Sequence, residues 1–202
     1  MNFRIGRVRI KISFLFFAML TMLFVVDKKG LALITVLCVT LHEFGHITAL
    51  CLFGSQPDEI VFGIFGIRIQ QNKYILSDLQ QTVVVFCGPL VNAILFATFL
   101  VANLVFQKQI LLMISAVNLV MGIFNLLPIL PLDGGRIMFY LLGLFFIEKT
   151  VHRIMRIICI ILLFVLILAG SFILLKTGLN ISLITTSVYL CVLCIKSIRI
   201  RY

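Results

Sequence analysis

Long apolar runs are the feature that most constrains this chain of 202 residues. They recur from one end to the other, so that 62% of the residues are hydrophobic and only 12% are charged. A soluble domain is nearer half apolar and a quarter charged. A run of roughly 18 or more apolar residues is typical of a helix that crosses a membrane. The sequence therefore predicts an all-α integral membrane protein.

We expect about six transmembrane helices within a single domain over residues 1–202. The predicted spans are 12–26, 31–53, 82–106, 109–127, 157–175 and 179–195. A further apolar stretch, 137–147, is too short to cross, and we expect a re-entrant or interfacial segment there, next to the sequence PLDGG. Residues 61–70 are rich in β-forming residues and interrupted by glycine, which predicts a short membrane-associated hairpin or sheet.

Positive charge predicts the orientation of these spans. Six spans place both termini on one side of the membrane, together with 13 of the 17 lysines and arginines. Because these residues are enriched in cytoplasmic loops, both termini of this multi-pass cell-membrane protein are predicted to be cytosolic. The basic segment 1–11 is expected to precede an uncleaved first span. The net charge of +10 is explained by these flanks, and we expect no nucleic-acid partner because no basic face or aromatic platform is visible.

The second predicted span contains the sequence HEFGH at residues 42–46. Residues four apart lie on one face of a helix, so His42 and His46 can share one tetrahedral Zn²⁺ ion. Glu43 is adjacent to the first ligand and can act as the catalytic base without binding the metal. Unpartnered polar groups in hydrocarbon cost on the order of several kcal/mol, which favours a functional site over a satisfied structural cluster.

Asp133 is the predicted third ligand, because a catalytic zinc site takes three protein ligands and keeps one position open. Pro128 and Pro131 end or kink the fourth span before it, and the two glycines that follow it permit a sharp turn. Such a backbone can present a carboxylate inside the helix bundle. The alternatives, Asp58 and Glu59, are expected to be solvated acids in an ordinary polar loop.

Asparagines accompany both motifs. Asn92 ends the sequence GPLVN at the start of the third span, and Asn125 closes the fourth span. Asparagines within spans usually form hydrogen bonds between helices, and this is the role favoured for Asn118. For Asn92 and Asn125, a structural role and a substrate-binding role both stay open.

The motifs HEFGH, GPLVN and NLLPILPLDGGR, in this order and on these spans, resemble the site-2 proteases, which are zinc intramembrane metalloproteases. The resemblance covers roughly residues 30–160 and is nearest to the subfamily that processes a pro-sigma factor during endospore formation. It implies one zinc ion held by His42, His46 and Asp133. It also implies that Asn125 and the stretch 128–131, including both prolines, border the substrate path. We expect neither the PDZ domain nor the CBS domain of other branches, and hence no nucleotide regulation.

The resemblance implies a zinc metalloendopeptidase in which Glu43 is the base and the substrates are membrane-embedded or membrane-associated proteins. Processing of a pro-sigma or anti-sigma factor is the specific expectation, and an inhibitory membrane partner is a further one. Two other classes stay open. A zinc transporter would show a chain of ligands along a pore, whereas an inactive protease-like chaperone would have lost a ligand or the base.

Overall fold

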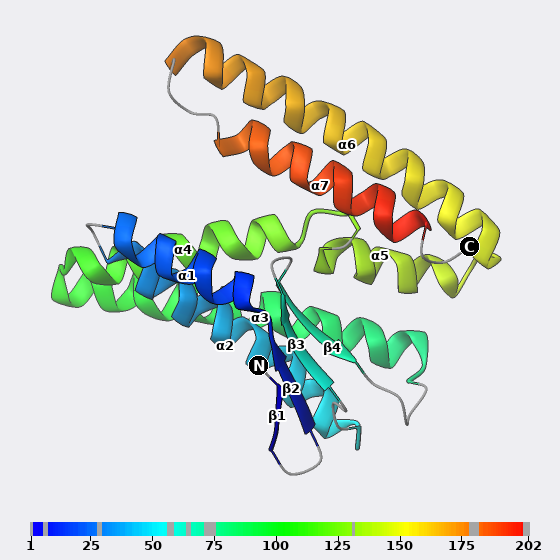
Figure 1. The fold of residues 1–202 in the computed structure, drawn as a ribbon, viewed down its shortest axis with the longest axis horizontal. Helices are drawn as coiled ribbons and strands as arrows, with labels where there is room; N and C mark the ends of the chain where they lie inside the picture. The colour runs from blue at the N-terminus through cyan, green and yellow to red at the C-terminus, as the bar shows by residue number, and fades with distance from the viewer. Residues whose placement is uncertain are drawn as a thin grey trace. The chain divides into compact units, whose positions relative to one another are not determined.

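The computed structural model describes residues 2–5, 8–27, 30–55, 59–63, 66–70, 76–130, 132–177 and 182–199, which are mostly helical (Figure 1). In chain order, the elements are β1 (Asn2–Ile5), β2 (Val8–Ile12), α1 (Phe14–Val26), α2 (Leu31–Leu52), β3 (Glu59–Gly63), β4 (Gly66–Gln70), α3 (Asp78–Phe106), α4 (Gln109–Asn125), α5 (Asp133–Gly143), α6 (Glu148–Thr177) and α7 (Ser182–Arg199). The chain divides into two compact units, Met1–Ile123 and Phe124–Tyr202.

Each of the six predicted spans corresponds to a helix, namely α1, α2, α3, α4, α6 or α7. Among the described helices, α2, α3 and α6 are long and apolar enough to cross a membrane, and α1 and α4 are shorter apolar helices. The helices are therefore confirmed, and three of the six expected crossings meet the length and hydropathy that a crossing requires.

The first unit contains a four-stranded sheet in the order β1-β2-β3-β4. Its strands are drawn as neighbouring arrows in Figure 1. The outer pairs are antiparallel, and β2 runs parallel to β3, with Ile10 opposite Ile60. The predicted hairpin at 61–70 is confirmed by β3 and β4. The mostly helical fold is also confirmed, but the sheet is larger than the expected hairpin, because residues 2–5 and 8–12 form two further strands rather than only a basic flank.

The N-terminal strands have a clear physical cause. Apolar residues at 8, 10 and 12 alternate with Arg9 and Lys11, which is the two-residue period of a strand with one buried face. Lys11 Nζ lies 2.8 Å from Glu59 Oε1, and Glu59 is buried on β3. Glu59 was expected to be a solvated loop acid. It is instead paired with a lysine from the neighbouring strand, which accounts for its burial.

Helices α2 and α3 pack closely in the same unit. A Cβ atom on Gly45 would lie 2.7 Å from the Cys87 carbonyl oxygen and 2.9 Å from Val91 Cγ2, so only glycine allows this approach. Small residues at helix interfaces are common in membrane proteins because they let backbones come together. The start of α3 is fixed by a capping box in which the Ser77 hydroxyl accepts from the Gln80 N–H and the Gln80 side chain accepts from the Ser77 N–H.

In the second unit, α6 and α7 lie side by side (Figure 1) and form a core with the segment between α4 and α5. Ile129 of that segment is fully buried among side chains of the two helices. The buried residues of this cluster are Ile129, Cys159, Leu163, Leu190 and Cys194. Burial of Ile129 therefore anchors the connection that leads to Asp133.

The PLDGG sequence leads directly into a helix, because Asp133 is the first residue of α5. The two glycines do not make the expected sharp turn, since positive φ values among described glycines occur only at Gly30 and Gly54. They are needed for space instead. A Cβ atom on Gly134 would overlap the carbonyl of Leu126, and one on Gly135 would lie 2.5 Å from the carbonyl carbon of Ile129. The first turn of α5 thus rests directly on the backbone that precedes it.

Substitution of Gly134 by alanine is expected to destabilise the protein by about 1–3 kcal/mol, the usual cost of forcing extra atoms into a packed site. The midpoint of unfolding in mixed detergent and sodium dodecyl sulfate measures the change. Gly143→Ala, at the exposed end of the same helix, is the matched control and should leave the midpoint unchanged or raise it slightly. Equal midpoints for the two variants would contradict the close contact at Gly134.

Candidate metal centre

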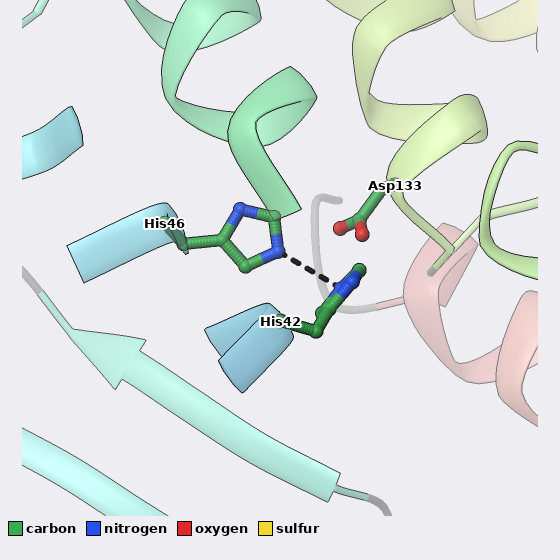
Figure 2. A group of neighbouring side chains, drawn as sticks. All are labelled: His42, His46 and Asp133. Atoms are coloured by element: carbon green, nitrogen blue, oxygen red, sulfur yellow. Dashed lines mark hydrogen bonds between the residues drawn. The ribbon is translucent and has the colours of Figure 1, made fainter. Parts of the chain in front are cut away.

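His42 and His46 lie one helical turn apart on α2, and both are buried. Figure 2 shows that their rings point toward each other. The two ring centroids are 4.8 Å apart. The two Nε2 atoms are separated by 3.2 Å. Two nitrogens held at the usual zinc distance by one tetrahedral ion are roughly 3.3 Å apart. The pair therefore already has the spacing that a shared zinc ion requires.

The orientation of His46 is fixed from α3. Its Nδ1 atom lies 2.9 Å from the backbone oxygen of Val84. A carbonyl can only accept, so Nδ1 carries the hydrogen, and in a neutral ring Nε2 presents its lone pair. A metal-binding histidine usually donates its second nitrogen to such a group. The contact thus sets the tautomer of His46 that suits a metal ligand.

Gly88 provides the space for both rings. A Cβ atom at this position would overlap the His46 ring and would lie 2.8 Å from His42 Cε1. The glycine of GPLVN thus allows α3 to pass directly beside the two imidazoles. The sequence alone did not assign Gly88 to the site. It could have been found there because its motif, GPLVN, is predicted to lie at the same membrane depth as the two histidines.

Asp133 completes the group. One ligand atom from each of His42, His46 and Asp133 lies within 4.8 Å of the other two, and all three residues are buried. Figure 2 shows the carboxylate directed toward the two imidazoles. Two neutral nitrogens and one carboxylate oxygen are a common ligand set of catalytic zinc, which leaves one position open. This set fits a single zinc ion, and the three predicted ligands form its site.

The remaining predicted residues are placed as follows. Glu43 follows His42 on α2 and is half-buried. Asn92 is fully buried on α3, with its amide beside His42. Asn125 is the last residue of α4 and, like Pro128 in the connection after it, is half-buried. Pro131 lies outside the described residues. The catalytic role of Glu43 and the substrate-binding roles of the others stay predictions.

Asn118 has the structural role that the sequence favoured. It is fully buried on α4, and its Nδ2 atom lies 3.1 Å from the Cys38 sulfur on α2 and 2.9 Å from the Ile114 carbonyl oxygen. The side chain thus links two helices, as buried amides in membrane bundles do.

Comparison with known proteins gives a consistent result. Residues 105–169 match the model of Peptidase family M50. The structure is similar to the solved site-2 protease from Methanocaldococcus jannaschii, with a TM-score of 0.70 and 24% identity over 97% of this chain and 94% of that one. A zinc metalloprotease of the same organism is 31% identical over 105 residues, which are 50% of this chain and 30% of the relative. Stage IV sporulation protein FB of Bacillus subtilis is 33% identical over 122 residues, 58% of this chain and 42% of the relative.

The fold and the ligand set define a multi-pass membrane protein with the architecture of a site-2 protease and a zinc site of two histidines and one aspartate. The match of residues 105–169 to Peptidase family M50 agrees with both. The chain spans less than half the length of the curated relatives described above.

Proposed function

We propose that this chain is an intramembrane protease that hydrolyses peptide bonds of membrane-embedded or membrane-associated proteins. One observation carries the proposal: His42, His46 and Asp133 converge to within 4.8 Å, with Glu43 next to the first ligand on an apolar helix. Among the described residues, this is the one group of His, Cys, Asp or Glu side chains with metal-binding geometry. A transporter would require further ligands along a path, so a single centre favours hydrolysis.

The reaction assigns one task to each residue. His42, His46 and Asp133 would hold the zinc ion, which when bound polarises the peptide carbonyl and activates water. Glu43 accepts the proton of the attacking water as its oxygen bonds to the carbonyl carbon. Glu43 then gives this proton to the amide nitrogen as the carbon–nitrogen bond breaks. Water is consumed, and a carboxylic acid and an amine are released.

A helical substrate must unwind locally, because its carbonyl groups are occupied by its own hydrogen bonds. Strand β4 is an edge strand of the sheet and pairs with β3 on one side. An edge strand can bind an extended segment through backbone hydrogen bonds. We therefore propose that β4 holds the unwound substrate, and that substrates carry helix-weakening residues near the cleavage site.

The remaining elements of the proposal concern setting and partners. The excess of positive charge supports a cytosolic position for both termini, from which water would reach the site. The resemblance to the sporulation subfamily, together with the similarity to stage IV sporulation protein FB, supports a pro-sigma or anti-sigma factor as substrate and an inhibitory membrane protein as partner.

Removal and return of zinc tests the proposal. The purified chain in detergent is mixed with a tagged reporter whose membrane helix contains a glycine–proline pair at its centre. We expect cleavage that stops when phenanthroline removes the metal and resumes when zinc is added, because the residual side chains cannot polarise the carbonyl alone. Zinc flux through proteoliposomes without any cleavage would instead support a transporter.

A further inference from the structure

The second nitrogen of His42 contacts a side chain rather than the backbone. His42 Nδ1 lies 2.9 Å from the amide nitrogen Nδ2 of Asn92, which is on α3, 50 residues further along the chain. Asn92 has no exposed surface, and its Oδ1 atom has no hydrogen-bond partner among the described residues. The site thus contains a buried amide with an unused acceptor, next to a zinc ligand.

Zinc binding limits how this contact can be made. A neutral imidazole has one N–H and one lone pair, and a ring that binds zinc through Nε2 must carry its hydrogen on Nδ1. This Nδ1–H needs an acceptor, and the amide oxygen of Asn92 can supply one, because the Asn92 amide already lies beside Nδ1. A half-turn about the Cβ–Cγ bond exchanges the oxygen and the nitrogen of the amide without moving other atoms.

We propose that Asn92 is a positioning residue for the zinc site, whose amide oxygen accepts the hydrogen bond from His42 Nδ1–H and so fixes the ring with Nε2 toward the metal. Together with the Val84 carbonyl on His46, it gives each zinc-binding imidazole one acceptor from α3. These two acceptors lie on either side of Gly88, the residue that leaves space for the rings. Roughly two turns of α3, from Val84 to Asn92, therefore shape both histidine ligands.

Three variants of the purified chain test this role. Asn92→Leu removes the acceptor and keeps a similar volume, whereas Asn92→Asp keeps an acceptor and removes the donor. The matched control is Asn118→Leu, since Asn118 is also a fully buried asparagine with an unpartnered Oδ1 atom but contacts Cys38 instead of a ligand. Zinc affinity is measured by competition with a chromophoric chelator.

We expect Asn92→Leu to bind zinc about 10–100-fold more weakly, the usual effect of losing a hydrogen bond to a metal ligand. Asn92→Asp should bind zinc at least as tightly as the original protein, and Asn118→Leu should bind it as the original protein does. Because the chain has three histidines, ¹⁵N-histidine spectra can also report the Nδ1–H tautomer of His42 in the zinc-loaded protein.

The proposal is overturned if Asn92→Leu keeps full affinity, if Asn92→Asp is as weak as Asn92→Leu, or if Asn118→Leu weakens zinc binding equally. It rests on the zinc site of the proposed function, but its readout is metal affinity rather than cleavage. A protein that binds zinc in this Asn92-dependent way and cleaves nothing would contradict the protease and leave the positioning role intact. A protein that cleaves the reporter but whose zinc affinity does not depend on Asn92 would support the protease and contradict the positioning role.

Discussion

Glutamine in place of Glu43 is expected to lower the rate of peptide-bond hydrolysis by about 10²–10⁴-fold, the range that a general base contributes. The amide has nearly the shape of the carboxylate but cannot accept the proton of the attacking water. Since Glu43 is not one of the three ligands, the variant should still bind one zinc ion. If Glu43→Gln loses activity but keeps its full zinc content, Glu43 acts as a base and not as a metal ligand.

The measurement combines zinc analysis with comparative membrane proteomics of cells that carry the original chain or Glu43→Gln. A membrane protein that accumulates as a longer precursor in the variant identifies the substrate. Glu148→Gln serves as the control, because Glu148 is an exposed acid at the start of α6. Full activity of Glu43→Gln would exclude Glu43 as the catalytic base.

The helices and the metal ligands could be predicted because their signals are local. Hydrophobic runs fix the helices through the transfer of apolar side chains out of water, and this physics needs no knowledge of partners. The four-residue spacing of His42 and His46 places them on one helical face in any environment. Asp133 was found by elimination among seven acids, helped by the prolines and glycines around it.

The sheet, and the contacts that the Nδ1 atoms of His42 and His46 make with α3, depend on residues far apart in the chain. The alternation in residues 8–12 is visible in the sequence, but its basic residues are equally typical of a membrane flank, and only pairing with β3 decides between them. The contact between Asn92 and His42 requires the register of α2 against α3. That register is set by the close approach at Gly45 and Gly88, which periodicity does not reveal.

Substitution of Gly88 by alanine is expected to weaken zinc binding by more than about 100-fold, beyond the usual effect of losing one hydrogen bond to a ligand. The new Cβ atom would occupy space now held by the His46 ring and would press on His42 Cε1, at 2.8 Å. Neither ring can retreat freely, because Val84 holds His46 and Asn92 contacts His42 from the same helix. To relieve the overlap, α3 must move away or the rings must turn, and either change separates the two Nε2 atoms.

Gly122→Ala is the matched control, since Gly122 is also a buried glycine inside a helix, and its Cβ atom would only touch Asn92 Cβ at an ordinary 3.4 Å. The control should keep its zinc, and both variants should gain slightly in helix propensity. Zinc retained after dialysis, together with the cobalt absorption spectrum, measures the ligand geometry, and the unfolding midpoint shows that the helices remain assembled. If Gly88→Ala kept its zinc and the cobalt spectrum of the original protein, the two imidazoles could not lie against α3 at Gly88. That result would contradict the role of Gly88 in leaving space for the rings.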